Sequence, residues 1–209
     1  MNLEQKIQSG TQYRDFRALT PQGDEMIVEG YATTFDQPYL LYRDDGYEVW
    51  EQVDRNAFNE TNMTDVVMQY DHQGRVFARN TNGTLSLRAD DEGLHVTAML
   101  GGTELGRQLY EEIKGGYTTK MSFGFTVDED RREITETEDN VRVLRTILKI
   151  GRLYDVSAVS IPANDGTTIS ARSYGVECVN EIAEEFRKRD ERREQIARIK
   201  ALTEVNYGE

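Results

Sequence analysis

The chain has little of several residue types, and each shortage excludes a class of protein. Its 209 residues include one cysteine, Cys178, so it can form neither an internal disulfide nor a cysteine metal cluster. Two histidines, His72 and His95, are too few for a histidine-rich metal site. No run reaches the roughly 18 apolar residues of a membrane span, and residues 1–10 lack the apolar segment of a signal peptide. We therefore expect a cytoplasmic protein without metal or other cofactor.

Positive charge is also in short supply. The chain carries 25 Lys and Arg against 38 Asp and Glu, a formal net charge of −13. A nucleic-acid-binding surface needs Lys and Arg to neutralise phosphates, and anionic membranes attract basic segments. We therefore expect neither nucleic acid nor a membrane as a partner. The length fits one folded domain with an appendage better than two full domains.

The most informative stretch is residues 120–127. Met121, Phe123 and Phe125 alternate there with Ser122 and Gly124. This period of two predicts a strand with one apolar face. The opposite face carries only small side chains, which leaves room for another group beside the hydroxyl of Ser122.

Further strands are predicted from the same alternation at residues 26–32, 49–53, 66–72, 84–88, 94–100, 141–150 and 153–161. A helix is expected after Thr103, a good N-cap, with its end at Gly115 and Gly116. Residues 35–46 contain Pro38 and an Asp-Asp-Gly turn signal, so we expect a surface loop there. The mostly charged residues 128–140 are expected to form an exposed hairpin tip.

The two ends of the chain differ in composition from the middle. Residues 1–12 are polar and are expected to be flexible. Residues 177–202 contain no Gly or Pro, are dense in Glu and Arg, and have only narrow apolar stripes. They predict a charged helix that is either solvated or a removable or scaffold-binding segment. The expected organisation is therefore a flexible segment 1–12, a domain 13–174 and a helical tail 175–209.

Three residues have the chemistry of a hydrolytic site. A serine hydroxyl such as that of Ser122 is a weak nucleophile until a base takes its proton, and His72, at the end of a predicted strand, is suited to do so. Asp155 lies in an apolar strand, where a carboxylate needs a partner, and it could orient the imidazole. The residue types alone are weak evidence, and the chain has no Gly-x-Ser-x-Gly motif.

Rival assignments use neighbours of these residues. Asp71 could orient His72, although on a regular strand its side chain would point to the other face. Ser157 shares the face of Asp155 and is interpreted as structural. A metal hydrolase built on His72, Asp71 and Asp155 is a further alternative that the few histidines disfavour.

Several motifs, in order, resemble the prohead maturation proteases of tailed bacteriophages, which are relatives of the herpesvirus assemblin proteases. They are Glu-Gly-Tyr-Ala-Thr-Thr-Phe at 29–35, Gln-Tyr-Asp-His at 69–72, Asp-Glu-Gly-Leu at 91–94, Lys-Met-Ser-Phe-Gly-Phe at 120–125 and Leu-Tyr-Asp-Val-Ser-Ala-Val-Ser-Ile-Pro-Ala at 153–163. The resemblance spans about residues 13–172.

The resemblance implies an α+β, mostly antiparallel fold, with an assemblin-like β-barrel wrapped by a few helices. It implies a serine endopeptidase with Ser122 as nucleophile, His72 as base and Asp155 as the third member, where the family more often has Glu. Its substrates would be the major capsid protein, scaffold segments and the protease itself, inside proheads assembling in the host cytoplasm, and it could self-associate. The alternative is a non-catalytic capsid-assembly or scaffold protein with the same fold.

Overall fold

A computed structural model of the chain describes residues 12–16, 20–22, 26–44, 47–137 and 141–160, together with residues 184, 187, 188, 191, 192 and 195. The chain divides into two compact units, Met1–Tyr174 and Gly175–Glu209. The described part of the first unit consists mostly of strands with one α-helix, which agrees with the predicted α+β, mostly β class. The six described residues of the second unit have helical backbone. The remainder of the predicted charged helix, and the segment 1–12 except its last residue, lie outside the described residues.

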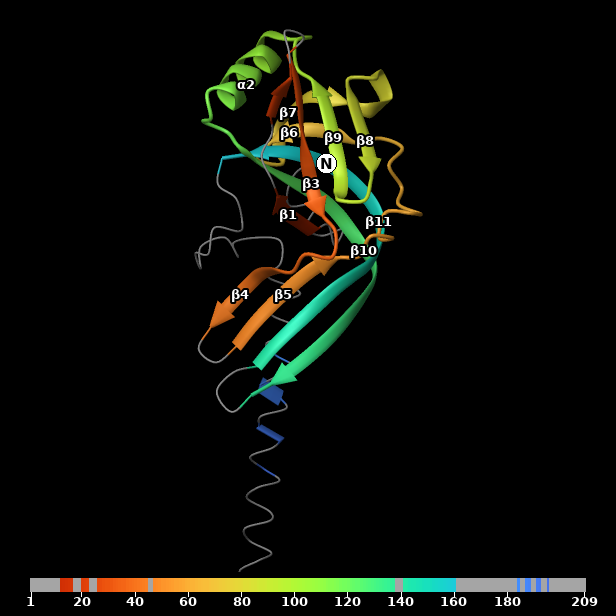
Figure 1. Ribbon diagram of the computed structural model, residues 1–209, viewed down its shortest axis with the longest axis vertical. Helices are drawn as coiled ribbons and strands as arrows, with labels where there is room; N and C mark the ends of the chain where they lie inside the picture. The colour runs from red at the N-terminus through yellow and green to blue at the C-terminus, as the bar shows by residue number, and fades with distance from the viewer. Residues whose placement is uncertain are drawn as a thin grey trace, which may run out of the picture. The chain divides into compact units, whose positions relative to one another are not determined.

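A long antiparallel hairpin organises a seven-stranded sheet (Figure 1). Its arms are β10 (Lys120–Glu136) and β11 (Val141–Val159). β1 (Gln12–Phe16) pairs with the start of β10. The other edge of β11 has two parallel partners, β5 (Tyr47–Val53) along residues 141–147 and β6 (Val67–Tyr70) along residues 155–158. β4 (Tyr39–Asp44) and β7 (Gln73–Arg79) complete the sheet by antiparallel pairing with β5 and β6.

A second sheet is antiparallel throughout and has the order β2-β3-β9-β8. Its strands are β2 (Thr20–Gln22), β3 (Ile27–Thr34), β8 (Leu85–Ala89) and β9 (Gly93–Met99). A short 3-10 helix, η1 (Asn80–Asn82), connects the two sheets between β7 and β8. The predicted hairpin of residues 84–88 and 94–100 is therefore confirmed as β8 and β9.

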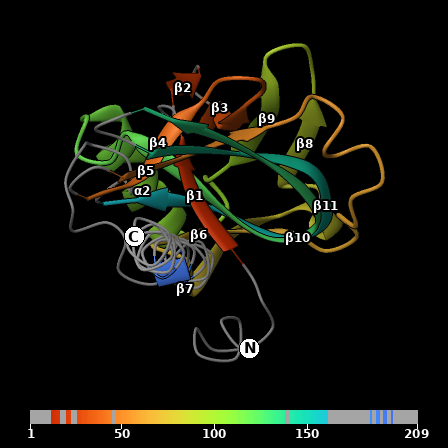
Figure 2. The ribbon, with the colours of Figure 1, turned by 90° about the horizontal axis from the view of Figure 1, so that it is seen from below.

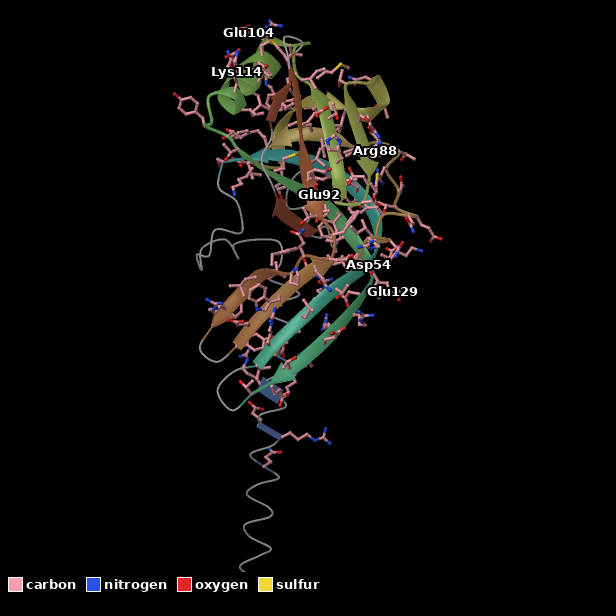
Figure 3. The ribbon with its side chains drawn as sticks, viewed as in Figure 1. Asp54, Arg88, Glu92, Glu104, Lys114 and Glu129 are labelled. Carbon is pink, nitrogen blue, oxygen red and sulfur yellow. The ribbon has the colours of Figure 1, made fainter. Side chains whose placement is uncertain are left out.

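The helix α2 (Glu104–Lys114) has the predicted cap, because the Thr103 hydroxyl accepts a hydrogen bond from the Gly106 N–H. Glu104 and Lys114, labelled in Figure 3, lie at its two ends. An acid in the first turn and a base in the last turn both interact favourably with the helix dipole. Among the described residues, no helix is long and apolar enough to span a membrane.

The apolar face predicted for residues 120–127 is confirmed. Met121, Phe123 and Phe125 are fully buried in the main core, and the rings of Phe123 and Phe125 stack with centroids 4.4 Å apart. The small-residue face is buried as well, at Ser122 and Gly124. In Figure 2, β10 and β11 curve together past β1, which pairs with this part of β10.

The strands differ from the implied antiparallel barrel in closure and in the direction of two pairs. Among the described strands, the hydrogen-bonding forms two sheets and does not close a barrel. β11 divides its free edge between β5 and β6, so the first sheet branches there. This branching also introduces two parallel pairs into a fold that was expected to be mostly antiparallel.

Three local predictions were wrong in whole or in part. The loop expected at residues 35–46 contains β4, because its turn signal closes a hairpin with β5. The exposure expected for the hairpin tip at residues 128–140 is confirmed for nearly all of residues 128–136, but β10 continues through them as far as Glu136. The two strands expected at 141–150 and 153–161 are one strand, β11, with irregular pairing to β10.

Candidate active site

Ser122 lies on β10 on the face opposite the apolar core residues. The register pairs Ser122 with Ser157 and Gly124 with Asp155 on β11. Directly opposed residues on antiparallel strands point to the same face of a sheet. The ladder alone therefore places Ser122, Gly124, Asp155 and Ser157 on one face.

His72 reaches this face from a tight turn between β6 and β7. The parallel pairing of β6 with β11 ends at Tyr70 opposite Ala158, and Tyr70 pairs with Gln73 to close the turn. Both intervening residues have positive φ, 47° at Asp71 and 59° at His72. Such a pair defines the type I′ family of hairpin turns, which usually contain Asn-Gly. His72 was predicted at the end of a regular strand, and this was wrong because β6 ends two residues earlier.

Two short hydrogen bonds connect the three predicted side chains. The distance from His72 Nδ1 to Asp155 Oδ1 is 2.6 Å, and that from His72 Nε2 to Ser122 Oγ is also 2.6 Å. A carboxylate only accepts hydrogen bonds, so the neutral imidazole carries its proton on Nδ1, and Nε2 accepts from the hydroxyl of Ser122. Ser122 and Asp155 are fully buried, and His72 is 9% exposed. The structure thus brings all three sequence-predicted residues together.

Ser157 adds a contact that the sequence-based interpretation did not include. Its hydroxyl donates to Asp155 Oδ1 at 2.8 Å, and its side chain is fully buried. His72 and Ser157 therefore donate to the same carboxylate oxygen. The sequence signal was present, because Ser157 is two residues from Asp155 on one strand, and side chains at that spacing share a face.

The carboxylate of Asp71 bonds to Ser160, whereas His72 Nδ1 bonds to Asp155. Asp71 Oδ1 accepts from the Ser160 N–H at 2.9 Å, and Asp71 Oδ2 accepts from the Ser160 hydroxyl at 2.9 Å. The rival assignment of Asp71 as the partner of the His72 ring is thus wrong. Among the described residues, no group of three or more His, Cys, Asp or Glu could hold a metal ion.

The base of the β6–β7 hairpin is held by a charged pair. The Arg79 guanidinium donates to both carboxylate oxygens of Asp65, at 2.6 and 2.5 Å. These hydrogen bonds are the main reason that the pKa of Asp65 lies below its usual value, and the charge of Arg79 adds to the effect. The Asn80 side chain also accepts from the Val66 N–H and donates to the Met63 carbonyl. These contacts fix the base of the hairpin that carries His72, and the contact of Asp71 with Ser160 holds its turn.

A buried serine, histidine and aspartate joined in this order form the arrangement found in serine hydrolases. The family model described as caudovirus prohead serine protease matches residues 14–182, and the chain belongs to that family. It is accordingly a protease of the phage prohead-maturation class.

Comparisons with solved structures and with curated proteins give less information than the family model. The solved structure of the capsid assembly protease gp21 of bacteriophage T4 is 14% identical to the chain, and the match covers 73% of this chain and 99% of that one, with a TM-score of 0.38. No curated protein matches the chain.

Proposed function

We propose that the chain is a serine endopeptidase that cleaves capsid and scaffold proteins, and itself, during prohead maturation. Ser122 is the nucleophile, His72 the general base and Asp155 the residue that orients His72. One observation carries the proposal, which is that His72 hydrogen-bonds to Ser122 and Asp155 through its two ring nitrogens, each at 2.6 Å. Family membership supports both the protease class and the prohead as its place of action.

The mechanism follows from the positions of the protons. Ser122 Oγ attacks the carbonyl carbon of the scissile peptide while its proton passes to His72 Nε2. The imidazolium that forms is stabilised by Asp155, which accepts from Nδ1. His72 then gives the proton to the departing amine nitrogen, and the acyl group stays on Ser122. Water, deprotonated by His72, releases the acyl group and restores the site.

The nucleophile is not exposed in this structure. Ser122 has no accessible surface, although its hydroxyl already contacts the base. A peptide carbonyl must approach the Ser122 oxygen closely, so binding of an extended substrate has to displace the atoms that cover the serine.

The deciding experiment is co-expression of the chain with the major capsid protein of the same phage, followed by intact-mass measurement of all products. Wild type is expected to give defined capsid-protein fragments, and Ser122→Ala is expected to give none. Ser86→Ala is the matched control, because Ser86 is an exposed serine on β8 in the other sheet. It should cleave as the wild type does.

The other outcomes separate the alternatives. Cleavage that persists in Ser122→Ala would mean that the nucleophile is wrongly assigned. Identical masses in wild type and Ser122→Ala, with normally assembled shells, would instead favour the non-catalytic assembly or scaffold role. Shortened forms of the chain itself that require Ser122 would establish self-cleavage and show whether the tail 175–209 is removed.

A further inference from the structure

We propose that Asp71 is a positioning residue that fixes the orientation of His72 by tying the His72 turn to the end of β11. The inference rests on the proposed protease function, and it adds a residue to which that function assigns no role. Two observations support it. The backbone and the side chain of Asp71 both contact the chain at the end of β11, and the turn that contains Asp71 and His72 has positive φ at both residues.

The backbone contact extends the β6–β11 ladder. Parallel pairing ends with Tyr70 opposite Ala158, and the Asp71 N–H then donates to the Ala158 carbonyl at 2.9 Å. Asp71 is therefore the last residue held by β11 before the chain turns. His72, the next residue, depends for its backbone position on this hydrogen bond and on the pairing of Tyr70 with Gln73.

The carboxylate of Asp71 makes a second attachment farther along β11. Oδ1 accepts from the Ser160 N–H at 2.9 Å, while the Ser160 hydroxyl lies 2.9 Å from Oδ2 and 3.2 Å from Oδ1. Ser160 directly follows the last residue of β11. Both oxygens of the carboxylate are thus used to hold the turn against the strand that also carries Asp155.

The turn needs such attachments because its conformation is unfavourable for its residues. Both Asp71 and His72 have positive φ, which non-glycine residues adopt only when the surrounding structure enforces it. Asp tolerates this region better than most residues, and its side chain can bond to nearby backbone. Asp71 therefore satisfies two requirements, the left-handed backbone and the link to Ser160.

Taken together, β11 holds His72 at two points. Asp155 fixes the ring through Nδ1, and Asp71 fixes the backbone from which the ring projects. If the turn were released, the ring could move relative to both Asp155 and Ser122, and both of its hydrogen bonds would loosen. Misplacement of a catalytic group by about 1 Å can lower the rate roughly 100-fold, so the Asp71–Ser160 contact should affect catalysis without touching substrate.

Three variants separate the properties of Asp71. Asp71→Gly keeps a backbone free to adopt positive φ but removes the carboxylate, and Asp71→Asn keeps an oxygen acceptor for Ser160 but removes the charge. Ser160→Ala removes the hydroxyl donor and leaves the backbone N–H. Asp90→Gly is the matched control, because Asp90 likewise accepts from backbone N–H groups, those of Glu92 and Gly93, in the β8–β9 turn of the other sheet.

The first measurement is kcat and KM on a peptide spanning the capsid-protein cleavage site mapped by co-expression. We expect kcat to fall about 10- to 100-fold in Asp71→Gly with little change in KM, since the group acts on the base and not on substrate binding. Asp71→Asn should retain most of the wild-type kcat, Ser160→Ala should lose several-fold, and Asp90→Gly should match the wild type. Wild-type kcat in folded Asp71→Gly overturns the proposal. If Asp71→Gly does not fold, unchanged kcat in Ser160→Ala overturns it.

The second measurement does not need activity. The Nδ1 proton of His72, bonded to Asp155, should give a far-downfield proton NMR signal, identified by its loss in His72→Gln. We expect Asp71→Asn and Asp90→Gly to keep this signal and Asp71→Gly to broaden or shift it. An unchanged signal in Asp71→Gly contradicts the positioning role. Cleavage that survives Ser122→Ala defeats the proposed function itself, whereas normal cleavage in Asp71→Gly defeats only the role of Asp71.

Discussion

Ser122 and Ser157 lie directly opposite each other on β10 and β11, and their hydroxyls contact different members of one hydrogen-bonded chain. The hydroxyl of Ser122 meets His72 Nε2, and that of Ser157 donates to Asp155 Oδ1. The cross-strand pair therefore distinguishes two serines that the sequence offered as rival hydroxyls. Only Ser122 is placed to transfer its proton to the base.

This difference predicts unequal effects of two alanine variants. Ser122→Ala should remove measurable cleavage, because it removes the proposed nucleophile. Ser157→Ala should lower kcat about tenfold, since one hydrogen bond to a charged acceptor contributes about 1.5 kcal/mol and its loss leaves Asp155 less well oriented. Cleavage rates on the mapped capsid peptide check both expectations. Equal loss in the two variants would contradict the assignment of separate roles.

Asp155→Asn tests the carboxylate without changing its size. The asparagine amide can donate to His72 Nδ1, which would then act as acceptor and leave the proton on Nε2, facing Ser122. We expect kcat to fall by up to about 10⁴-fold, because in this tautomer Nε2 cannot accept the proton of Ser122. Asp91→Asn, an exposed change at the β8–β9 turn, should leave kcat unaltered. A full-rate Asp155→Asn enzyme would mean that another group orients His72.

Much of the site could be predicted because its chemistry follows simple sequence patterns. Alternation around Ser122 gave its strand and the buried face, and an acid within the apolar run of β11 required a partner, which proved to be His72. The turn at His72 could not be predicted, since His72 occupies the second position of positive φ, where such turns usually have Gly. The contact of Asp71 with Ser160, 89 positions apart in the chain, depends on this turn.

The elements that were missed are those whose stability comes from pairing and not from their own residues. The outer part of β10, residues 128–136, is almost wholly exposed and charged, so it has no apolar period to detect. It is a strand because β11 pairs with it as far as Glu136. β4 was missed because the turn signal at residues 44–46 was assigned to a loop and not to the hairpin it closes.

The Asp65–Arg79 pair predicts a pH-dependent stability of the hairpin that carries His72. The pKa of Asp65 is lowered by its hydrogen bonds from Arg79, so the stabilisation is fully present above the unfolded-state pKa of about 3.9 and is lost as the pH falls through the folded-state pKa. Asp65→Asn should therefore melt below the wild type at neutral pH, and the difference should shrink under strongly acidic conditions. Calorimetry of wild type and variant across this range measures it.

Arg79→Gln provides the control for that experiment. It removes the same pair from the other side, so its difference from wild type should also close on acidification, and the double variant should add little to either single change. A difference in melting temperature between wild type and Asp65→Asn that stays constant down to the lowest pH would show that the Asp65 charge does not contribute through Arg79.

Gly106 gives a prediction that contradicts helix propensity. Alanine is better than glycine within a helix by about 1 kcal/mol, yet a Cβ built at Gly106 would lie 2.1 Å from the Leu100 carbonyl oxygen. That oxygen belongs to backbone and cannot move aside as a side chain could, so α2 would have to shift. Overpacking of this kind costs about 1–3 kcal/mol, so Gly106→Ala should lower the melting temperature by a few degrees. Gly102→Ala, where the added Cβ meets nothing within 4 Å, should leave it nearly unchanged. A stabilised Gly106→Ala would mean that the start of α2 is not held against Leu100 as the structure shows.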